Sequence, residues 1–193
     1  NVPAIGQDLS SFRQAGTSQY EAWYSSQISS VGATTVSVPF NNLRAVPFIN
    51  GRSGDIDRLA FVVTTAAALS SCRIGIYDSI SRTNLYPNAL IVDGGAFTTT
   101  STGIKSFTIS PSQALNANSV YWFVFISDVA NPTIRAGNNY SIPPILGNTS
   151  ALGATSNVYL TYSTAYGALP STFPTGASMA TGSAPLGYVR YAG

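Results

Sequence analysis

Val120-Tyr-Trp-Phe-Val-Phe-Ile-Ser127 is the most hydrophobic stretch of the chain and decides its fold class. It consists almost entirely of β-branched and aromatic residues, which favour strands. A continuous apolar run of this kind is typical of a strand whose two faces are both covered. We therefore expect residues 120–127 to form a central strand of a β-sheet.

Alternating apolar and polar residues extend the strand pattern to both sides of this segment. In residues 55–65 the apolar side chains of Ile56, Leu59, Phe61 and Val63 mostly share one face, as in a strand with one buried side. Further strands are expected at residues 34–40, 43–50, 73–78, 89–92, 96–99, 104–109, 133–136, 158–162 and 186–191.

Turn residues separate the expected strands. Thr102-Gly103 and Asp93-Gly94-Gly95 are interpreted as turns, and Pro47 marks an edge position or a bulge, because proline cannot donate a ladder hydrogen bond. Residues 137–152 and 165–185 are rich in Gly, Pro, Asn and Ser and are expected to be long loops.

Strands at this spacing without a convincing helical segment predict an all-β fold. We expect an antiparallel jelly-roll β-sandwich formed by residues 31–193. Residues 1–30 show no sustained alternation and are expected to be an irregular N-terminal arm that packs on the body or on a neighbour. No internal repeat of fixed period is visible, which disfavours a propeller or a β-helix.

The supply of catalytic side chains is small. The chain of 193 residues has no histidine, seven carboxylates and one cysteine, Cys72, which we expect to be a small buried hydrophobic residue. General acid–base catalysis, activated nucleophiles and zinc sites all draw on such residues in clusters, and the sequence shows none. A paired-carboxylate glycosidase is not excluded by the count alone. We expect a non-enzymatic protein without a metal or cofactor.

Four aspartates have local explanations. Asp55 and Asp57 lie two apart at a strand start, but a calcium site needs several further oxygen ligands, so we interpret them as a turn cap with an ion pair to Arg58. Asp78 and Asp128 each end a strong strand; they either share one rim of the sandwich or simply form turns.

The charge pattern limits the partners. Only 8% of the residues are charged, against about 25% in a typical soluble domain, and the net charge is +2. No Lys/Arg run provides the clustered basic face that nucleic acid requires, and no apolar run approaches the ~18 residues of a membrane helix. We expect neither a nucleic-acid nor a membrane partner. A weakly self-repelling surface suits a protein packed into a large assembly.

Tyrosines beside asparagines are the candidate ligand-binding residues. Tyr140, Tyr162 and Tyr166 lie in or beside loops that contain Asn138, Asn139, Asn148 and Asn157. An aromatic face packs on the C–H groups of a sugar ring, while amides bond its hydroxyls. Tyr is also enriched at subunit interfaces, so an interface role remains open for the same residues.

The order and spacing of seven segments resemble a β-sandwich domain of tailed-bacteriophage virion proteins, found at tail-fibre ends and in exposed capsid or tail components. The resemblance covers residues 43–191, about three quarters of the chain. The segments that carry it are residues 43–49, 56–66, 73–78, 85–93, 121–128, 165–174 and 184–190.

This resemblance implies a structural protein located in the virion, with a jelly-roll body, assembled as a homotrimer beside other virion proteins. The first expected function is that of a tail or fibre component that attaches to a host cell-surface glycan. The alternative is a capsid decoration (cement) protein that stabilises the head through the arm, residues 1–30.

Overall fold

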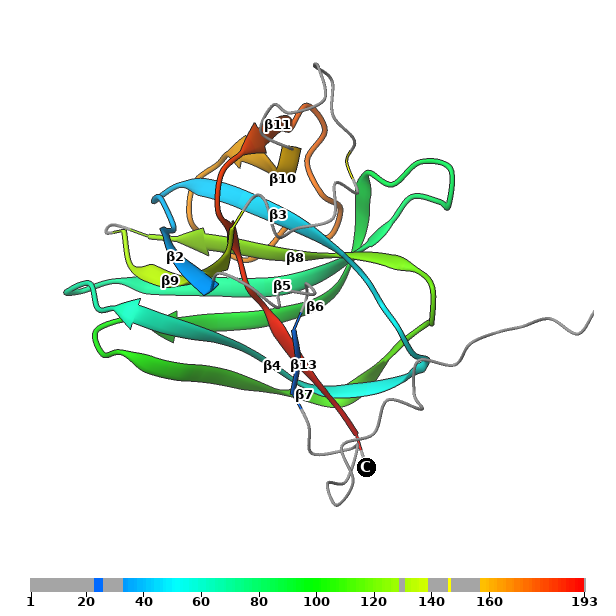
Figure 1. Ribbon diagram of the computed structural model, residues 1–193, viewed down its shortest axis with the longest axis horizontal. Helices are drawn as coiled ribbons and strands as arrows, with labels where there is room; N and C mark the ends of the chain where they lie inside the picture. The colour runs from blue at the N-terminus through cyan, green and yellow to red at the C-terminus, as the bar shows by residue number, and fades with distance from the viewer. Residues whose placement is uncertain (1–22, 26–32, 129–130, 139–145, 147–156, 193) are drawn as a thin grey trace, which may run out of the picture.

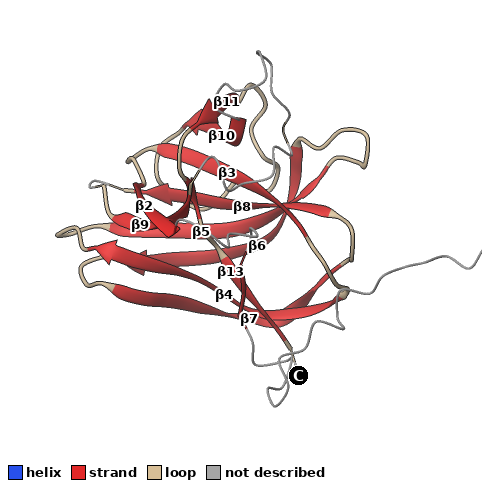
Figure 2. Ribbon diagram, in the orientation of Figure 1, coloured by secondary structure: helices blue, strands red, loops and turns tan. Residues whose placement is uncertain are grey.

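The computed structural model describes residues 23–25, 33–128, 131–138, 146 and 157–192. Within these residues the protein is all-β, with thirteen strands in two sheets whose strand pairings are antiparallel, consistent with a β-sandwich (Figure 1; Figure 2). The expected all-β class is confirmed. No helix in this described part has the length and apolar character needed to cross a membrane.

The two sheets share the strands almost equally. The seven-stranded sheet contains β1 (Trp23–Ser25), β2 (Ala33–Ser37), β4 (Gly54–Thr65), β7 (Gly103–Leu115), β9 (Thr133–Gly137), β12 (Ala184–Pro185) and β13 (Tyr188–Tyr191). The six-stranded sheet contains β3 (Asn42–Ile49), β5 (Ser71–Ser79), β6 (Pro87–Thr98), β8 (Val120–Ser127), β10 (Asn157–Ser163) and β11 (Ser178–Thr181).

Strand β8 lies between β3 and β5 and is buried on both faces, as its sequence predicts. Phe123 and Phe125 point into the main core between the sheets. Trp122, Val124 and Ile126 point the other way, into a second core on the outer face of the six-stranded sheet. The continuous apolar run of β8 is thus explained by two cores, one on each side of the strand.

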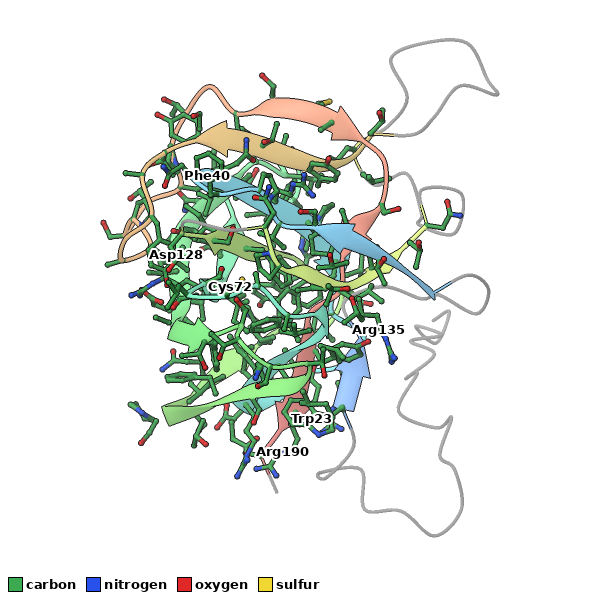
Figure 3. All side chains as sticks on the ribbon, turned by 90° about the vertical axis from the view of Figure 1, so that its left-hand side faces the viewer. Trp23, Phe40, Cys72, Asp128, Arg135 and Arg190 are labelled. Atoms are coloured by element: carbon green, nitrogen blue, oxygen red, sulfur yellow. The ribbon has the colours of Figure 1, made fainter. Side chains whose placement is uncertain are left out.

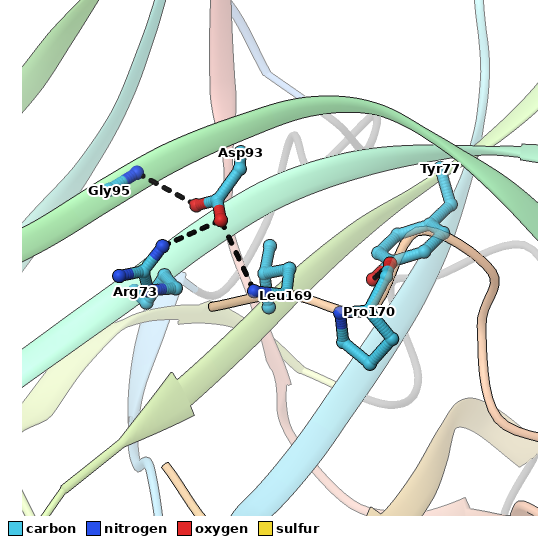
Figure 4. A network of polar contacts seen from close by, with 6 residues as sticks. All are labelled: Arg73, Tyr77, Asp93, Gly95, Leu169 and Pro170. Carbon is cyan, nitrogen blue, oxygen red and sulfur yellow. Dashed lines mark hydrogen bonds and ion pairs between the residues drawn. The ribbon is translucent and has the colours of Figure 1, made fainter. Parts of the chain in front are cut away.

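Residues 164–177, here called the strap, cover that outer face. Leu169 and Phe173 of the strap are buried against the sheet. The Tyr77 hydroxyl donates a hydrogen bond of 2.6 Å to the Pro170 carbonyl (Figure 4). Residues 165–185 were expected to form one long loop; in the structure they hold most of the strap and the short strands β11 and β12.

The Asp93-Gly94-Gly95 segment is a bulge and not a turn. It lies inside the continuous strand β6, where the register against β5 shifts beside these residues. Gly95 adopts a φ of +72°, which glycine reaches without a steric penalty, and its N–H donates to Asp93 Oδ1 at 2.9 Å. The two strands expected at 89–92 and 96–99 are therefore one strand.

Among the described residues, Pro47 has a paired strand on one side only. Strand β10 pairs with only the first half of β3, residues 42–45, while β8 pairs along the other edge as far as Ile49. Within the described part of the chain, no strand pairs with that side of β3 beyond residue 45, so this stretch is a sheet edge there. The expected edge position of Pro47 is confirmed, although β3 begins as an interior strand.

Part of the expected N-terminal arm belongs to the sheet. Trp23–Ser25 form β1, which pairs with β13 from Arg190 to Tyr188. The other residues of the segment 1–30 lie outside the described part of the chain. The structure therefore places β1, which the sequence analysis counted as irregular, at the edge of the seven-stranded sheet.

Candidate functional site

An open groove lies at one end of the sandwich, between the β5–β6 loop (residues 80–86) and the β7–β8 loop (residues 116–119). These two loops lie toward the right in Figure 1. Its volume is about 510 Å³. We call it the end groove. Its lining residues are Asp78, Ser79, Ser81, Arg82, Leu85, Ile91, Ala114, Asn116, Asn118, Ser119, Val120 and Tyr121.

The β5–β6 loop uses its own polar groups to fix its shape. Ser81 Oγ accepts hydrogen bonds from the N–H groups of Thr83 and Asn84, at 3.2 and 2.9 Å. Asn84 Oδ1 accepts from the Tyr86 N–H at 3.1 Å. Arg82 takes no part in this network: its side chain is exposed and makes no hydrogen bond or ion pair with any residue in the described part of the chain.

The β7–β8 loop on the opposite wall is also fixed through its backbone. The Asn118 N–H donates to the Asn50 carbonyl at 2.7 Å, and the Asn50 N–H donates to the Ser119 carbonyl at 2.9 Å. The Asn116 N–H donates to the Tyr121 hydroxyl at 2.8 Å. The side-chain amides of Asn116 and Asn118 are exposed and bond no other described residue, so both remain available to a ligand.

The floor of the groove joins it to the outer core. Ser79 Oγ donates to the Val120 carbonyl at 2.9 Å and accepts from Trp122 Nε1 at 3.1 Å. The same indole N–H also donates to the Leu85 carbonyl at 2.8 Å. Buried Trp122 therefore bonds residues at both ends of the β5–β6 loop and fixes the distance between Ser79 and Leu85, which both line the groove.

Asp78 and Asp128 lie at opposite ends of β5 and do not share a rim. Asp78 lines the end groove, and its Oδ1 accepts from the Ala89 N–H at 2.6 Å. Asp128 lies at the other end of the sandwich, in the face toward the viewer in Figure 3, where it accepts from the Ser71 N–H at 2.9 Å. Each carboxylate bonds a backbone N–H of another strand, Asp78 that of β6 and Asp128 that of β5, and only Asp78 lines the groove.

The structure separates the candidate residues expected from the sequence. Asn138 is half-buried just after β9, and Asn139 and Tyr140 lie outside the described residues. Tyr162 of β10 and Tyr166 of the strap are half-buried and pack against the outer core. Of the three candidates that the structure describes, Asn138, Tyr162 and Tyr166, none lines the end groove.

Tyr166 departs from the exposed side chain that was expected. Its hydroxyl oxygen is buried without a hydrogen-bond partner among the described residues, and burial raises its pKa. The nearby Arg73 guanidinium opposes part of that shift, and its Nε is buried in the same way. The ring packs against the sheet, which is the interface or packing role that the sequence analysis left open.

The groove residues were missed because they come from separate short loops and none is an exposed aromatic. A signal was nevertheless present. The strongest strand, residues 120–127, follows directly after Asn116-Ala-Asn118, and Arg82 follows the strand at 73–78. Antiparallel pairing of β5 with β8 brings the end of one strand beside the start of the other, and with them these polar loops.

The ion pair expected between Asp57 and Arg58 is replaced in the structure by one between Asp57 and Arg190 of β13. Its hydrogen bonds with Arg190 lower the pKa of Asp57. Asp55 is exposed at the start of β4. Across the described residues, no three His, Cys, Asp or Glu side chains are grouped so that they could hold a metal ion.

We expect Cys72 to be inert toward thiol reagents in the folded protein. Its side chain is completely buried, and burial raises the pKa of the thiol to about 12, so almost no thiolate exists at pH 8. A chromogenic disulfide reagent should label no thiol in buffer and one thiol per chain in denaturant. Rapid labelling of the folded protein at pH 8 would contradict this burial.

Comparisons with known proteins leave the family open. No protein-family model and no curated protein match the chain. One similar solved structure is the crystal structure of the cysteine protease and lectin-like domains of Cwp84, a surface layer associated protein of Clostridium difficile. The match has 9% sequence identity and a TM-score of 0.43, and covers 82% of this chain but 36% of that one.

Proposed function

We propose that the protein is a non-enzymatic structural component of a tailed-bacteriophage virion that attaches to a host-surface saccharide through the end groove. The observation that carries the proposal is the set of groups lining this groove. A carboxylate from Asp78, the guanidinium of Arg82 and the amides of Asn116 and Asn118 surround an apolar wall that includes Leu85.

These groups match the surface of a sugar. Saccharide hydroxyls both donate and accept hydrogen bonds, so they bond carboxylates, amides and guanidinium groups alike. The Leu85 and Ile91 side chains offer apolar contact to the C–H face of a ring. Ligand sites are typically concave and combine apolar walls with a few fixed polar groups, and the hydrogen-bonded loops provide that fixation here.

Binding without cleavage fits the same residues. Acid–base hydrolysis of a glycosidic bond normally uses two carboxylates that face each other across the bond. The residues that line the end groove include one carboxylate, Asp78, and it is already bonded to the Ala89 N–H. This composition favours an attachment protein over a glycosidase.

A jelly-roll topology is part of the proposal, and the strand pairings support it. Strands β2 to β9 pair as nested hairpins: β2 with β9, β3 with β8, β4 with β7 and β5 with β6. Pairing of β9 with β4 and of β8 with β5 then produces the orders β2-β9-β4-β7 and β3-β8-β5-β6. Two such four-stranded sheets make an eight-stranded double Greek key.

Capsid decoration is the second candidate function. It is favoured by β1, because this strand shows that part of the segment 1–30 can add to a sheet edge. The half-exposed Trp23 of β1 offers an apolar contact at that edge. In either role the protein is located in the virion, and we propose a homotrimer, which sedimentation equilibrium of the purified chain tests directly.

A co-sedimentation assay separates the two candidates. The protein is mixed with intact host cells, and separately with virus particles that lack it. Attachment predicts saturable pelleting with cells that host polysaccharide competes away. Decoration predicts pelleting only with particles, lost when residues 1–30 are deleted.

We expect the paired change Asn116→Ala with Asn118→Gly to weaken cell pelleting by about fivefold to a hundredfold, since each lost hydrogen bond contributes about 0.5–1.5 kcal/mol. Glycine preserves the positive φ of 57° at residue 118, so the loop keeps its shape. Tyr166→Phe probes the strap instead. Pelleting that is lost with Tyr166→Phe and unchanged in the paired groove variant would move the site from the groove to the strap.

A further inference from the structure

We infer that the saccharide bound in the end groove is acidic, and that Arg82 recognises its carboxylate. This inference rests on the proposed attachment function and adds the chemical class of the ligand. It starts from the state of Arg82, whose guanidinium stands at the groove without a partner in the described part of the chain.

Most of the other cationic side chains in the described part of the chain interact with a residue of the protein itself. Arg73 pairs with Asp93 and Arg190 with Asp57, while Arg44 and Arg52 lie over the rings of Tyr159 and Tyr191 and Lys105 bonds Ser101. A half-buried arginine that pairs with a carboxylate stabilises the fold. An exposed arginine on a hydrogen-bonded loop has no such role, and its charge is available to a ligand.

The loop that carries Arg82 is suited to presenting a guanidinium. Ser81 and Asn84 fix the loop backbone on both sides of it, through the Ser81 Oγ bonds and a 2.9 Å bond from the Ser81 N–H to the Asn84 carbonyl. A ligand therefore does not have to order the loop backbone on binding, which reduces the entropic cost. The planar guanidinium can then bond a carboxylate through two parallel N–H donors.

The other groove residues fit the remainder of an acidic sugar. Asn116 and Asn118 on the opposite wall can donate amide N–H groups to ring hydroxyls or to the carboxylate. Asp78 lies at the base of the loop, and its Oδ1 is held by a backbone N–H, which leaves Oδ2 to accept from hydroxyls. A uronic acid presents both a carboxylate and several hydroxyls, and the guanidinium, amide and carboxylate groups of the groove can bond groups of both kinds.

The test uses host-surface polysaccharide in two forms: native, and after carbodiimide activation and borohydride reduction have converted its carboxylates to neutral alcohols. The purified protein is titrated with each form. We expect the native polymer to bind at least about tenfold more tightly than the reduced polymer. We expect Arg82→Gln to weaken binding of the native polymer by about tenfold to a hundredfold, the range for a hydrogen bond to a charged group.

Two further variants make the result specific. Arg82→Lys keeps the charge but loses the two-donor fork, and should lie between the wild type and Arg82→Gln. Arg135→Gln removes another exposed arginine, on β9 and outside the groove (Figure 3), and should bind like the wild type. An equal loss in Arg135→Gln would show that only the overall charge matters and would overturn the inference.

The remaining outcomes separate the inference from the proposed function. Equal binding of both polymer forms, with cell pelleting intact, would overturn the acidic-ligand inference and leave attachment standing. Absence of competed cell pelleting would overturn attachment itself. All variants change exposed side chains, so their thermal unfolding midpoints should stay within a few degrees of the wild type, which confirms that they are folded.

Discussion

Replacing Trp122 with alanine is expected to lower the free energy of unfolding by about 3–5 kcal/mol, the largest effect of any single change considered for this chain. Trp122 is completely buried at the centre of the outer core, where it contributes the largest side chain. The change removes its apolar surface and leaves a cavity. It also removes the donor to Ser79 Oγ and to the Leu85 carbonyl.

The measurement is chemical denaturation followed by far-ultraviolet circular dichroism, because the change removes one of two tryptophans. Trp122→Phe separates packing from hydrogen bonding. It keeps most of the ring volume but leaves the Leu85 carbonyl without its donor, so we expect a loss of about 1–3 kcal/mol. Because Ser79 and Leu85 line the end groove, both variants should also weaken polysaccharide binding. Equal stability of Trp122→Ala and the wild type would contradict the two-core arrangement.

The strands with the strongest sequence patterns were predictable because the order of apolar and polar residues within one short segment indicates which of its faces are buried. Residues 120–127 are apolar on both faces and form β8, and residues 55–65 carry an apolar face and form most of β4. Pro47 marked an edge for a local reason, since its missing N–H is tolerated where no neighbouring strand pairs. In each case one short segment contained all the information needed.

Features that depend on distant segments were not predictable in the same way. Asp93-Gly94-Gly95 has the composition of a turn, and only its pairing with β5 makes it a bulge. Asp57 has Arg58 beside it in sequence, but its partner is Arg190, from the opposite end of the chain. The strap has loop composition, and its buried Leu169 and Phe173 are recognisable only once the outer face of the six-stranded sheet needs a cover.

The candidate site also depends on segments that are distant in sequence, and for that reason it was not predicted. Tyr162 and Tyr166 were chosen because aromatic residues beside amides suit sugars, yet the aromatic rings serve the outer core. The end groove instead uses Arg82, Asn116 and Asn118, which have little individual signature. They come together only because β5 pairs with β8 in the register that the structure shows, and this register could not be read from the sequence.

Replacing Gly75 with alanine is expected to destabilise the protein by about 3 kcal/mol, at the upper end of the usual range for overpacked sites. A Cβ atom at this position of β5 would lie 2.5 Å from the Val92 carbonyl oxygen and closer still to Leu169 Cδ1. The leucine end can rotate away, but the carbonyl belongs to the backbone of β6. The strand pair or the strap must therefore shift.

A matched glycine and a double variant test this explanation by denaturation with fluorescence detection. Gly167→Ala lies in the strap where a Cβ atom meets nothing within 4 Å, so its stability should stay near that of the wild type. Leu169→Ala alone should lower the free energy of unfolding by about 2–5 kcal/mol. The loss should be clearly smaller when Gly75→Ala is already present, because removing the leucine side chain also removes one of the two clashes of the new Cβ atom. Costs that simply add would show that Leu169 of the strap does not press on Gly75. A combined cost smaller than the sum of the two would show that the missing side chain of Gly75 makes room for Leu169 of the strap. This close approach explains how the strap buries the apolar outer face of the six-stranded sheet.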